Sequence, residues 1–536
     1  MIQFTALLLL TLAGPARADG PVVRQILVER GPIFSTEDRE RLPWLPLGLV
    51  NLVHVDTRER VIRRELVFGA GDRVDDEALD ESERKLRATG FFGEAWVEME
   101  VVAPDTVDVR VRTRELWTTA LNGSYEKFED QLLWALEVRE RNFLGRAKSF
   151  HLSRRVDEDR STWAAGVGDR QLFDGTWQGS LRLANSNDGD ATSWSLRRPF
   201  FRLDSNWSGG IGYVHGGVRP RYYLSGGSYV RPRSDFTAMD FDLVRRIRST
   251  SDSVWRIGVG FRHLSQRFAP ELGLTEFRTD GGDAGEVDFG RDVLEDRTLN
   301  VPFLQTQRVS RRFARERFLF GMGRIEELPL GWEHQVQVGW VSRALGSSLS
   351  GVDFDSRLRW LRVGRWAASA NVGTRGLLTS NQAENLQATS SNSLYLTVRP
   401  DTRLAFGILG GTSTHLDRNN VYSLGTENGL RAAGFQEFAG DRLLRGNAEV
   451  RWMYTPGVLD LFTPGLVVFA DFGSAWFEDE KDWTWKLVRG AVGFGFRIGL
   501  NRATQDRPIR IDLGWPILYD NDRSAPVLSI GSGQLF

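Results

Sequence analysis

Beyond about residue 117 the chain alternates apolar and polar positions with a period of two. In 132–138, Leu, Trp, Leu and Val share one face, while Ala and Glu point the opposite way, and 494–500 and 509–515 repeat the pattern. Polar turns rich in Gly and Asp separate these segments of about ten residues. A period of two predicts β-strands with one apolar and one polar face.

Two architectures would use such strands. In a soluble sandwich the apolar face packs on a second sheet, whereas in an outer-membrane barrel it meets lipid and the polar face lines a wet lumen. Arg and Asp recur within the strands, and Trp and Tyr fall near strand ends, as an aromatic girdle requires. We therefore predict a mostly β fold in which 116–536 form an antiparallel transmembrane β-barrel. About 420 residues at about 26 per strand and connection give about sixteen strands.

The part before the barrel has a different pattern. Segment 75–89 predicts a helix, acidic in its first turn, basic in its last, and closed by Gly90. Segments 22–29, 96–102 and 106–111 alternate as strands. Together they predict a small α/β domain over 19–115.

The N-terminus indicates export. Residues 4–14 are an apolar run too short to span a bilayer, and Ala16-Arg17-Ala18 follows as a small-x-small cleavage pattern. We expect a signal peptide over 1–18. A buried N-terminal helix is the alternative, because no Lys or Arg precedes the apolar run.

Composition narrows the chemistry. The chain has no Cys and a net charge of −1, which excludes thiolate metal sites and disfavours nucleic-acid binding. Its six His lie far apart, and no nucleophile elbow or phosphate loop occurs. The acidic, Gly-rich stretch 280–292 does not fit an EF-hand and reads better as a long loop. We expect no enzyme activity, no catalytic residues, no metal and no cofactor.

Two motifs of the first domain resemble a POTRA domain. Gly69-x-Gly71-Asp72 and the turn Gly90-Phe91-Phe92 stand where that family has them, and the resemblance covers about residues 22–115. An unrelated small α/β plug domain is the alternative.

The C-terminal third resembles the outer-membrane insertase and translocase superfamily (BamA/TamA type and two-partner secretion transporters, the bacterial surface antigen family). Residues 430–451 resemble its long sixth-loop motif, with Arg431 at the arginine position. Ala432 and Ala433 replace the family's Gly-aromatic pair, and a shifted register would use Gly434-Phe435. The downstream matches are Phe438, Gly440, Asp441, Asn447 and Glu449.

Further segments resemble the barrel strands of that superfamily. They are an inner-wall strand (Phe469, Asp471, Gly473), a lumen strand (Gly493, Gly495, Arg497), the next strand (Arg510, Asp512), an early hairpin (Asn142, Gly145) and a degraded terminal assembly signal (Gly531, Phe536). Alternation places Asp471 on the lumen face, where a loop guanidinium can meet it in a two-pronged bond. We expect Arg431 and Asp471 to pin the loop inside the barrel, the alternative being two ordinary solvated residues.

The resemblance implies an outer-membrane protein that inserts or translocates polypeptides, with its first domain in the periplasm of a diderm bacterium. Expected partners are outer-membrane lipid, an unfolded β-strand client and accessory periplasmic proteins or lipoproteins, but no nucleic acid. A passive channel, or a two-partner secretion pore without insertase activity, is the alternative.

Overall fold

A computed structural model describes residues 20–532 apart from short gaps and one longer one. The gaps are 129–130, 224–228, 269–295, 323, 418–419, 456, 459–460, 480–481, 505–506 and 520–523. The expected signal peptide, the acidic stretch 280–292 and Phe536 lie outside the described residues.

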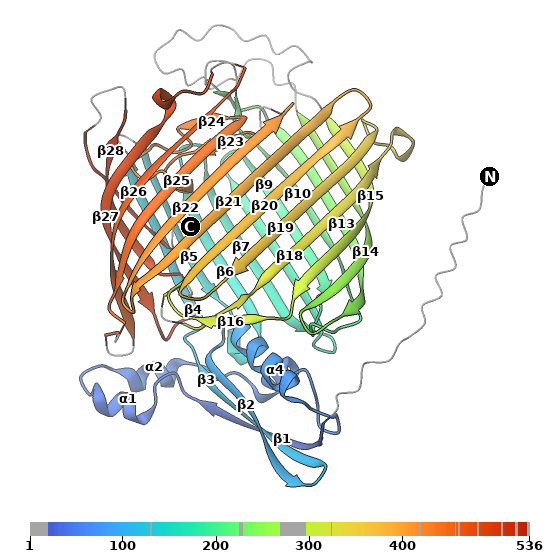
Figure 1. The fold of residues 1–536 in the computed structure, drawn as a ribbon, viewed down its shortest axis with the longest axis vertical. Helices are drawn as coiled ribbons and strands as arrows, with labels where there is room; N and C mark the ends of the chain where they lie inside the picture. The colour runs from blue at the N-terminus through green and yellow to red at the C-terminus, as the bar shows by residue number, and fades with distance from the viewer. Residues whose placement is uncertain are drawn as a thin grey trace, which may run out of the picture.

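The chain folds into a small N-terminal domain beneath one end of a large β-barrel (Figure 1). In the domain, β1 (Val22–Gly31) pairs parallel with β3 (Thr106–Glu115), and β2 (Phe92–Ala103) pairs antiparallel with β3. The sheet packs on α3 (Glu59–Glu65) and α4 (Asp76–Ala88).

The sequence predicted α4 and the strands of this domain correctly. The side chain of Asp75 caps α4 by accepting from the backbone N–H of Ala78 at 2.8 Å. Gly90, at φ 74°, reverses the chain after the helix. The POTRA assignment needs correction, however. Four helices stand between β1 and β2, and α1 (Thr36–Arg41) and α2 (Leu47–Val53) lie beside the sheet, toward a barrel turn.

The barrel closes with twenty strands, so the prediction of about sixteen is wrong. Neighbouring strands pair antiparallel around the whole circle, and β29 meets β4 to close it. Residues 116–536 make 421 residues, and 421/20 gives about 21 residues per strand rather than about 26. Many turns are only a few residues long, which is why more strands fit.

The strands are β4 (Thr119–Phe128), β5 (Gln131–Glu140), β6 (Lys148–Val156), β7 (Ser161–Leu172), β8 (Trp177–Ser186), β9 (Gly189–Arg198), β10 (Trp207–Val218), β13 (Ser234–Ser249), β14 (Ser253–Phe268), β15 (Arg297–Ser310), β18 (Gly331–Val341), β19 (Gly351–Arg362), β20 (Trp366–Thr379), β21 (Ala383–Arg399), β22 (Thr402–Thr414), β25 (Arg442–Met453), β26 (Phe462–Trp476), β27 (Arg489–Leu500), β28 (Ile509–Ile517) and β29 (Val527–Ser532).

The outer surface of the barrel is apolar and its inner surface polar. On β26, Leu466, Val468 and Phe472 are exposed on the outside, while Phe469 and Asp471 between them are buried inside. Other strands expose Ile, Val, Leu, Phe and Trp in the same alternating way. This is the surface of a barrel that crosses a bilayer. No helix in the described part of the chain is long and apolar enough to span a membrane.

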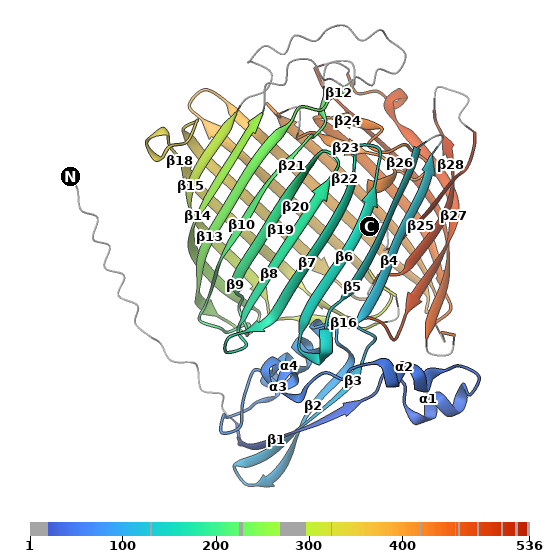
Figure 2. The ribbon, with the colours of Figure 1, turned by 180° about the vertical axis from the view of Figure 1, so that it is seen from behind.

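Short extra strands lie at both ends of the barrel, with β16 at the domain side and β23 and β24 near the opposite end (Figures 1 and 2). On the domain side, β16 (Phe313–Glu316) and β17 (Glu326–Pro329) form a hairpin, and the buried Leu319 at its tip packs on Tyr395 and Leu361 of the wall. On the opposite side, β23 (Tyr422–Leu424) and β24 (Phe438–Gly440) bracket a loop that enters the lumen. A third short pair, β11 (Tyr222–Tyr223) and β12 (Tyr229–Val230), lies between β10 and β13.

Candidate functional site in the barrel lumen

The loop between β23 and β24 folds back on itself before it meets the wall. Leu430 N–H donates to the carbonyl of Gly425 at 3.0 Å, and Ala433 N–H donates to that of Leu430 at 3.2 Å. The amide of Asn428 donates to the carbonyl of Ser423 at 2.6 Å. These local bonds present Arg431 to the inner wall.

Arg431 binds Asp471 of β26 in a two-pronged hydrogen bond. Its Nε lies 2.6 Å from Asp471 Oδ2 and its Nη2 lies 2.7 Å from Oδ1. The third nitrogen, Nη1, donates to Glu449 Oε1 at 2.9 Å. Planar guanidinium geometry matches a carboxylate in this way, and a lysine could not reproduce it. The structure thus brings the two residues of the expected pair together.

Charged residues on β25, β27 and β28 complete what we call the lumenal charge cluster (Arg431, Glu449, Arg451, Asp471, Arg497 and Asp512). Arg451 Nε donates to Glu449 Oε2 at 2.7 Å, and Arg497 Nη1 donates to Asp512 Oδ1 at 2.6 Å. All six side chains are buried, at 1–2% exposure. Within this set three cations meet three carboxylates, so its formal charge balances, as buried ions require. At its edge the less buried Arg510 adds a further ion pair to Asp512, at 3.3 Å.

Small residues make room for the loop against the wall. A Cβ on Gly493 would lie 2.5 Å from the ring of Phe469, and one on Gly473 would lie 2.7 Å from Leu424. A Cβ on Gly495 would lie 1.9 Å from Asp512 Oδ1. The guanidinium carbon of Arg431 sits 3.4 Å from the centre of the Phe469 ring, a cation–π contact. Side chains at these glycines would push the loop or its anchors away.

The Ala432-Ala433 step fits this site despite departing from the family pattern. Ala432 has φ 68°, in the region that favours glycine, and both alanines are buried. Ala432 packs with Ala491 and Val527, and its methyl lies 3.4 Å from the position of a Cβ on Gly514. An aromatic side chain at this point would find no space beside β28.

Several expected site residues lie apart from this cluster. Phe438, Gly440 and Asp441 form the base of the loop, where Asp441 Oδ1 accepts from Glu478 N–H at 3.0 Å. Gly531 stands on β29 opposite Arg510. Sequence reasoning missed Arg451, although the spacing Asn447-x-Glu449-x-Arg451 already places all three on one strand face.

The barrel closes at a short seam beside this site. Among the described residues, β29 faces β4 only over Leu528–Ile530 opposite Tyr125–Lys127, whereas β10 faces β13 along its whole length. The hydroxyl of Thr426 on the loop hydrogen-bonds Glu126 of β4, which stands opposite Ser529. The loop therefore contacts a seam strand.

The N-terminal domain is joined to the barrel by polar contacts. Arg87 of α4 pairs with Glu327 of the β16–β17 hairpin at 2.5 Å. The amide of Asn142 after β5 donates to Thr57 at 2.8 Å, and Gly145 comes so close to Asp56 that a Cβ would lie 2.1 Å from its carbonyl oxygen. Tight contact explains why this early hairpin carries Asn and Gly.

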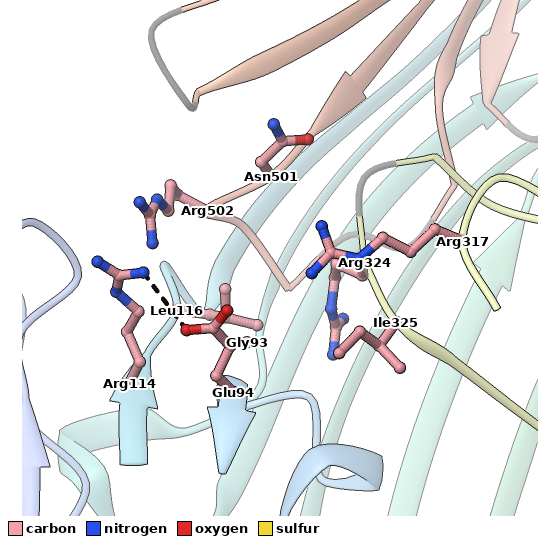
Figure 3. Close-up of a pocket in the computed structure, with 9 residues that line it drawn as sticks. All are labelled: Gly93, Glu94, Arg114, Leu116, Arg317, Arg324, Ile325, Asn501 and Arg502. Carbon is pink, nitrogen blue, oxygen red and sulfur yellow. Dashed lines mark hydrogen bonds and ion pairs between the residues drawn. The ribbon is translucent and has the colours of Figure 1, made fainter. Parts of the chain in front are cut away.

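A cavity of about 200 Å³ lies at this junction (Figure 3). Arg114 of β3, Arg317 and Arg324 of the 311–330 connection, and Arg502 after β27 line it, with Arg317 and Arg324 together on one side and Arg114 and Arg502 on the other. Arg114 pairs with Glu94 at 3.4 Å and with Asp38 at 3.5 Å, while Arg502 pairs with Asp38 at 3.6 Å. Asp38 thus links the domain to the β27–β28 connection.

No family model and no curated protein matches the chain. Among solved structures, BamA from Haemophilus ducreyi lacking POTRA domains 1–3 is 14% identical, with a TM-score of 0.42, over 96% of this chain and 85% of that one. CdiB from Acinetobacter baumannii is 13% identical, with a TM-score of 0.45, over 96% and 74% of the two chains. CdiB from Escherichia coli is 11% identical, with a TM-score of 0.45, over 98% and 92%.

Proposed function

We propose that this chain is an outer-membrane protein that inserts or translocates polypeptides, with its N-terminal domain in the periplasm. One observation carries the proposal. A loop is locked inside the barrel by a buried, charge-balanced cluster, and the same loop contacts β4 at the shortest strand pairing of the described barrel. A rigid lumen beside a weak seam suits a protein that opens between strands.

The seam supplies the route for a client strand. Within the described residues, only Tyr125–Lys127 of β4 pair with β29, whereas the whole of β4 pairs with β5, so the proposed entry point is the row of backbone N–H and C=O groups on the seam-side edge of β4. An incoming strand would satisfy them by β-augmentation. This step needs no covalent chemistry, so we propose no enzymatic role.

The N-terminal domain supplies a place to hold the client. Strand β2 is an outer strand of the sheet, because the strand order is β1-β3-β2 and β2 pairs only with β3 within the sheet. Its residues Trp96, Met99 and Val101 are exposed. An extended unfolded segment can add to such an edge, with apolar side chains giving affinity. Accessory periplasmic proteins or lipoproteins would reach the same exposed domain.

Reconstitution tests the proposal. We would place the protein in liposomes and follow the folding of an unfolded barrel client, together with single-channel current. The chain has no Cys, so Glu126→Cys with Ser529→Cys, which face each other across the seam, forms a unique cross-link. Oxidation should stop client folding and reduction should restore it.

A matched cross-link away from the seam controls this experiment. Ser180→Cys with Ser195→Cys spans β8 and β9 in the same way, and its oxidation should leave folding unchanged. Equal client folding with the seam locked and unlocked would contradict the proposal.

A pore is the second candidate, favoured by the opposite lumen wall. A polar cavity of about 500 Å³ lies there, lined by charged and amide side chains that include Arg197, Asp242 and Gln337. A steady current without any effect on client folding would support a channel or secretion pore.

A further inference from the structure

Helix α2 is apolar on all sides. Its sequence, Leu-Gly-Leu-Val-Asn-Leu-Val, has no charged residue. Its one polar side chain, Asn51, turns back to the chain, accepting from Phe34 N–H at 3.1 Å and donating to Phe34 C=O at 2.7 Å. Helices with no polar face are found where both sides are shielded from water.

One side of the helix is accounted for. Leu47 is buried and Val50 partly so, and they pack with Phe34 and Leu42 of the same segment. Leu461 of the barrel turn before β26 joins this group. The helix is thus fixed against the rim of the barrel.

The other side is bare within the described residues. Leu49, Leu52 and Val53, spaced i, i+3 and i+4, are 57%, 80% and 63% exposed, and Trp44 before the helix is 69% exposed. We call these four residues the α2 strip. Spacing of this kind puts the three helix residues on one face. Contiguous exposed apolar surface marks a place where something binds.

The position of the strip indicates what covers it. Leu461 is followed directly by Phe462, the first residue of β26, and Tyr454, Val458 and Phe462 are exposed around the same turn. The apolar outside of the wall therefore continues into the α1–α2 segment. Both ribbon views place α1 and α2 just beneath the rim, reaching outward on the β26–β27 side (Figures 1 and 2).

We propose that the α2 strip inserts into the near leaflet of the membrane around the barrel and anchors the N-terminal domain there. Trp suits the boundary between headgroups and acyl chains, and the leucines and valine suit the layer below it. Exposed charges of both signs, such as Arg41 and Glu40, flank the strip, so insertion should depend on apolar burial rather than on anionic lipid. The inference rests on the proposed membrane location of the barrel.

Single cysteines in this Cys-free chain test the inference. We would introduce Leu52→Cys, Val468→Cys and Val101→Cys separately, label each with an environment-sensitive fluorophore, and place the full chain in phosphatidylcholine nanodiscs. Val468 lies on the outer face of β26 and is 61% exposed, while Val101, 78% exposed, lies on β2 away from the barrel. Quenching by spin-labelled lipid and by aqueous iodide is then compared at the three sites.

We expect the labels at 52 and 468 to be quenched several-fold more by spin-labelled lipid than the label at 101, and the label at 101 to be quenched by iodide. A label at 52 that behaves like that at 101, while 468 reports lipid, overturns the anchor alone. Shielding of 52 from both quenchers also overturns it, in favour of a second copy covering the strip. Absence of lipid quenching at 468 overturns the membrane location as well.

Discussion

The two sides of the barrel lumen use the same residue types in opposite ways. The arginines and carboxylates of the lumenal charge cluster, along β25–β28, are buried at 1–2% exposure and bound in a fixed network. On β19, Arg357 and Asp355 also pair, at 3.3 Å, but the arginine side chain is 71% exposed. Exposed pairs contribute little to stability, whereas breaking a buried pair leaves an uncompensated charge. Ion pairs therefore hold the loop in place on one side of the lumen. On the other side they are exposed to solvent and contribute little to stability.

This difference predicts different roles for the two sides of the lumen. The buried side fixes the position of the loop relative to β26, β25 and β28, while the wet side leaves a polar cavity. Mutations should therefore unfold or loosen the protein on one side and change conduction on the other.

Breaking the central pair should have the largest effect. Asp471→Ala leaves the Arg431 guanidinium buried beside Glu449 without its two-pronged partner, and we expect the free energy of unfolding to fall by about 3–5 kcal/mol. Urea unfolding of the purified barrel measures the change. Arg431→Ala and the double variant complete a mutant cycle, in which the coupling should be at least about 1 kcal/mol. Purely additive losses would show that the two residues act independently.

Removing one cluster charge without removing volume should have a smaller effect. Glu449→Gln keeps the shape but leaves three cations facing two carboxylates, and we expect a loss of about 1–3 kcal/mol in the free energy of unfolding. Asp240→Asn on β13 is the matched control, because its carboxylate pairs with Arg197 at the partly exposed wall. Equal losses in the two variants would remove the distinction between the two sides.

The junction with the N-terminal domain offers a third kind of buried charge, one with little compensation. Burial lowers the pKa of Lys85 on α4 to about 7, although Glu65 lies 3.8 Å away. Its ammonium also lies over the Phe201 ring, 2.9 Å from the centre. Above pH 7 the unfolded chain holds this proton more tightly than the folded chain does, so stability rises with pH.

The expected slope is about 1 kcal/mol per pH unit between pH 7 and 8 from this group, and it levels off below pH 7, where both states are protonated. Lys85→Met should remove this contribution to the pH dependence of the free energy of unfolding, and it should stabilise the junction at pH 7. Urea unfolding of both proteins at pH 6, 7 and 8 measures it. An unchanged slope in Lys85→Met would assign the pH dependence to another group.

The sequence predicted which side chains of a strand face inward better than it predicted how many strands close the barrel. Alternation identified which faces of β26 and β27 turn inward, because the side-chain period of a strand depends only on the strand itself. Strand number depends on how much chain the turns and inserted segments consume. The β16–β17 hairpin and the lumen loop take up chain without adding to the wall, yet twenty strands still fit, because so many turns are short.

Some features of the candidate site could likewise be predicted from the sequence, and others could not. Arg431 and Asp471 could be paired from a motif and a strand face, and the structure places them in contact. The arrangement around Ala432 could not be foreseen, because it depends on Gly514 and Ala491 of neighbouring strands. The α1–α2 segment also lacks the long amphipathic pattern by which helices are recognised, since α2 has no polar face.

The smallest effect is expected on the wet wall, and it sharpens the opening comparison most directly. Arg357→Ala removes an arginine that is 71% exposed in its pair with Asp355, so the free energy of unfolding should change by less than about 0.5 kcal/mol. Arg357 lines the polar cavity, so removal of its positive charge should shift single-channel selectivity toward cations. Arg431→Ala should show the opposite pattern, with a large loss in the free energy of unfolding and little change in selectivity. If Arg357→Ala destabilised the barrel as much as Arg431→Ala, exposure would not be what distinguishes the two walls.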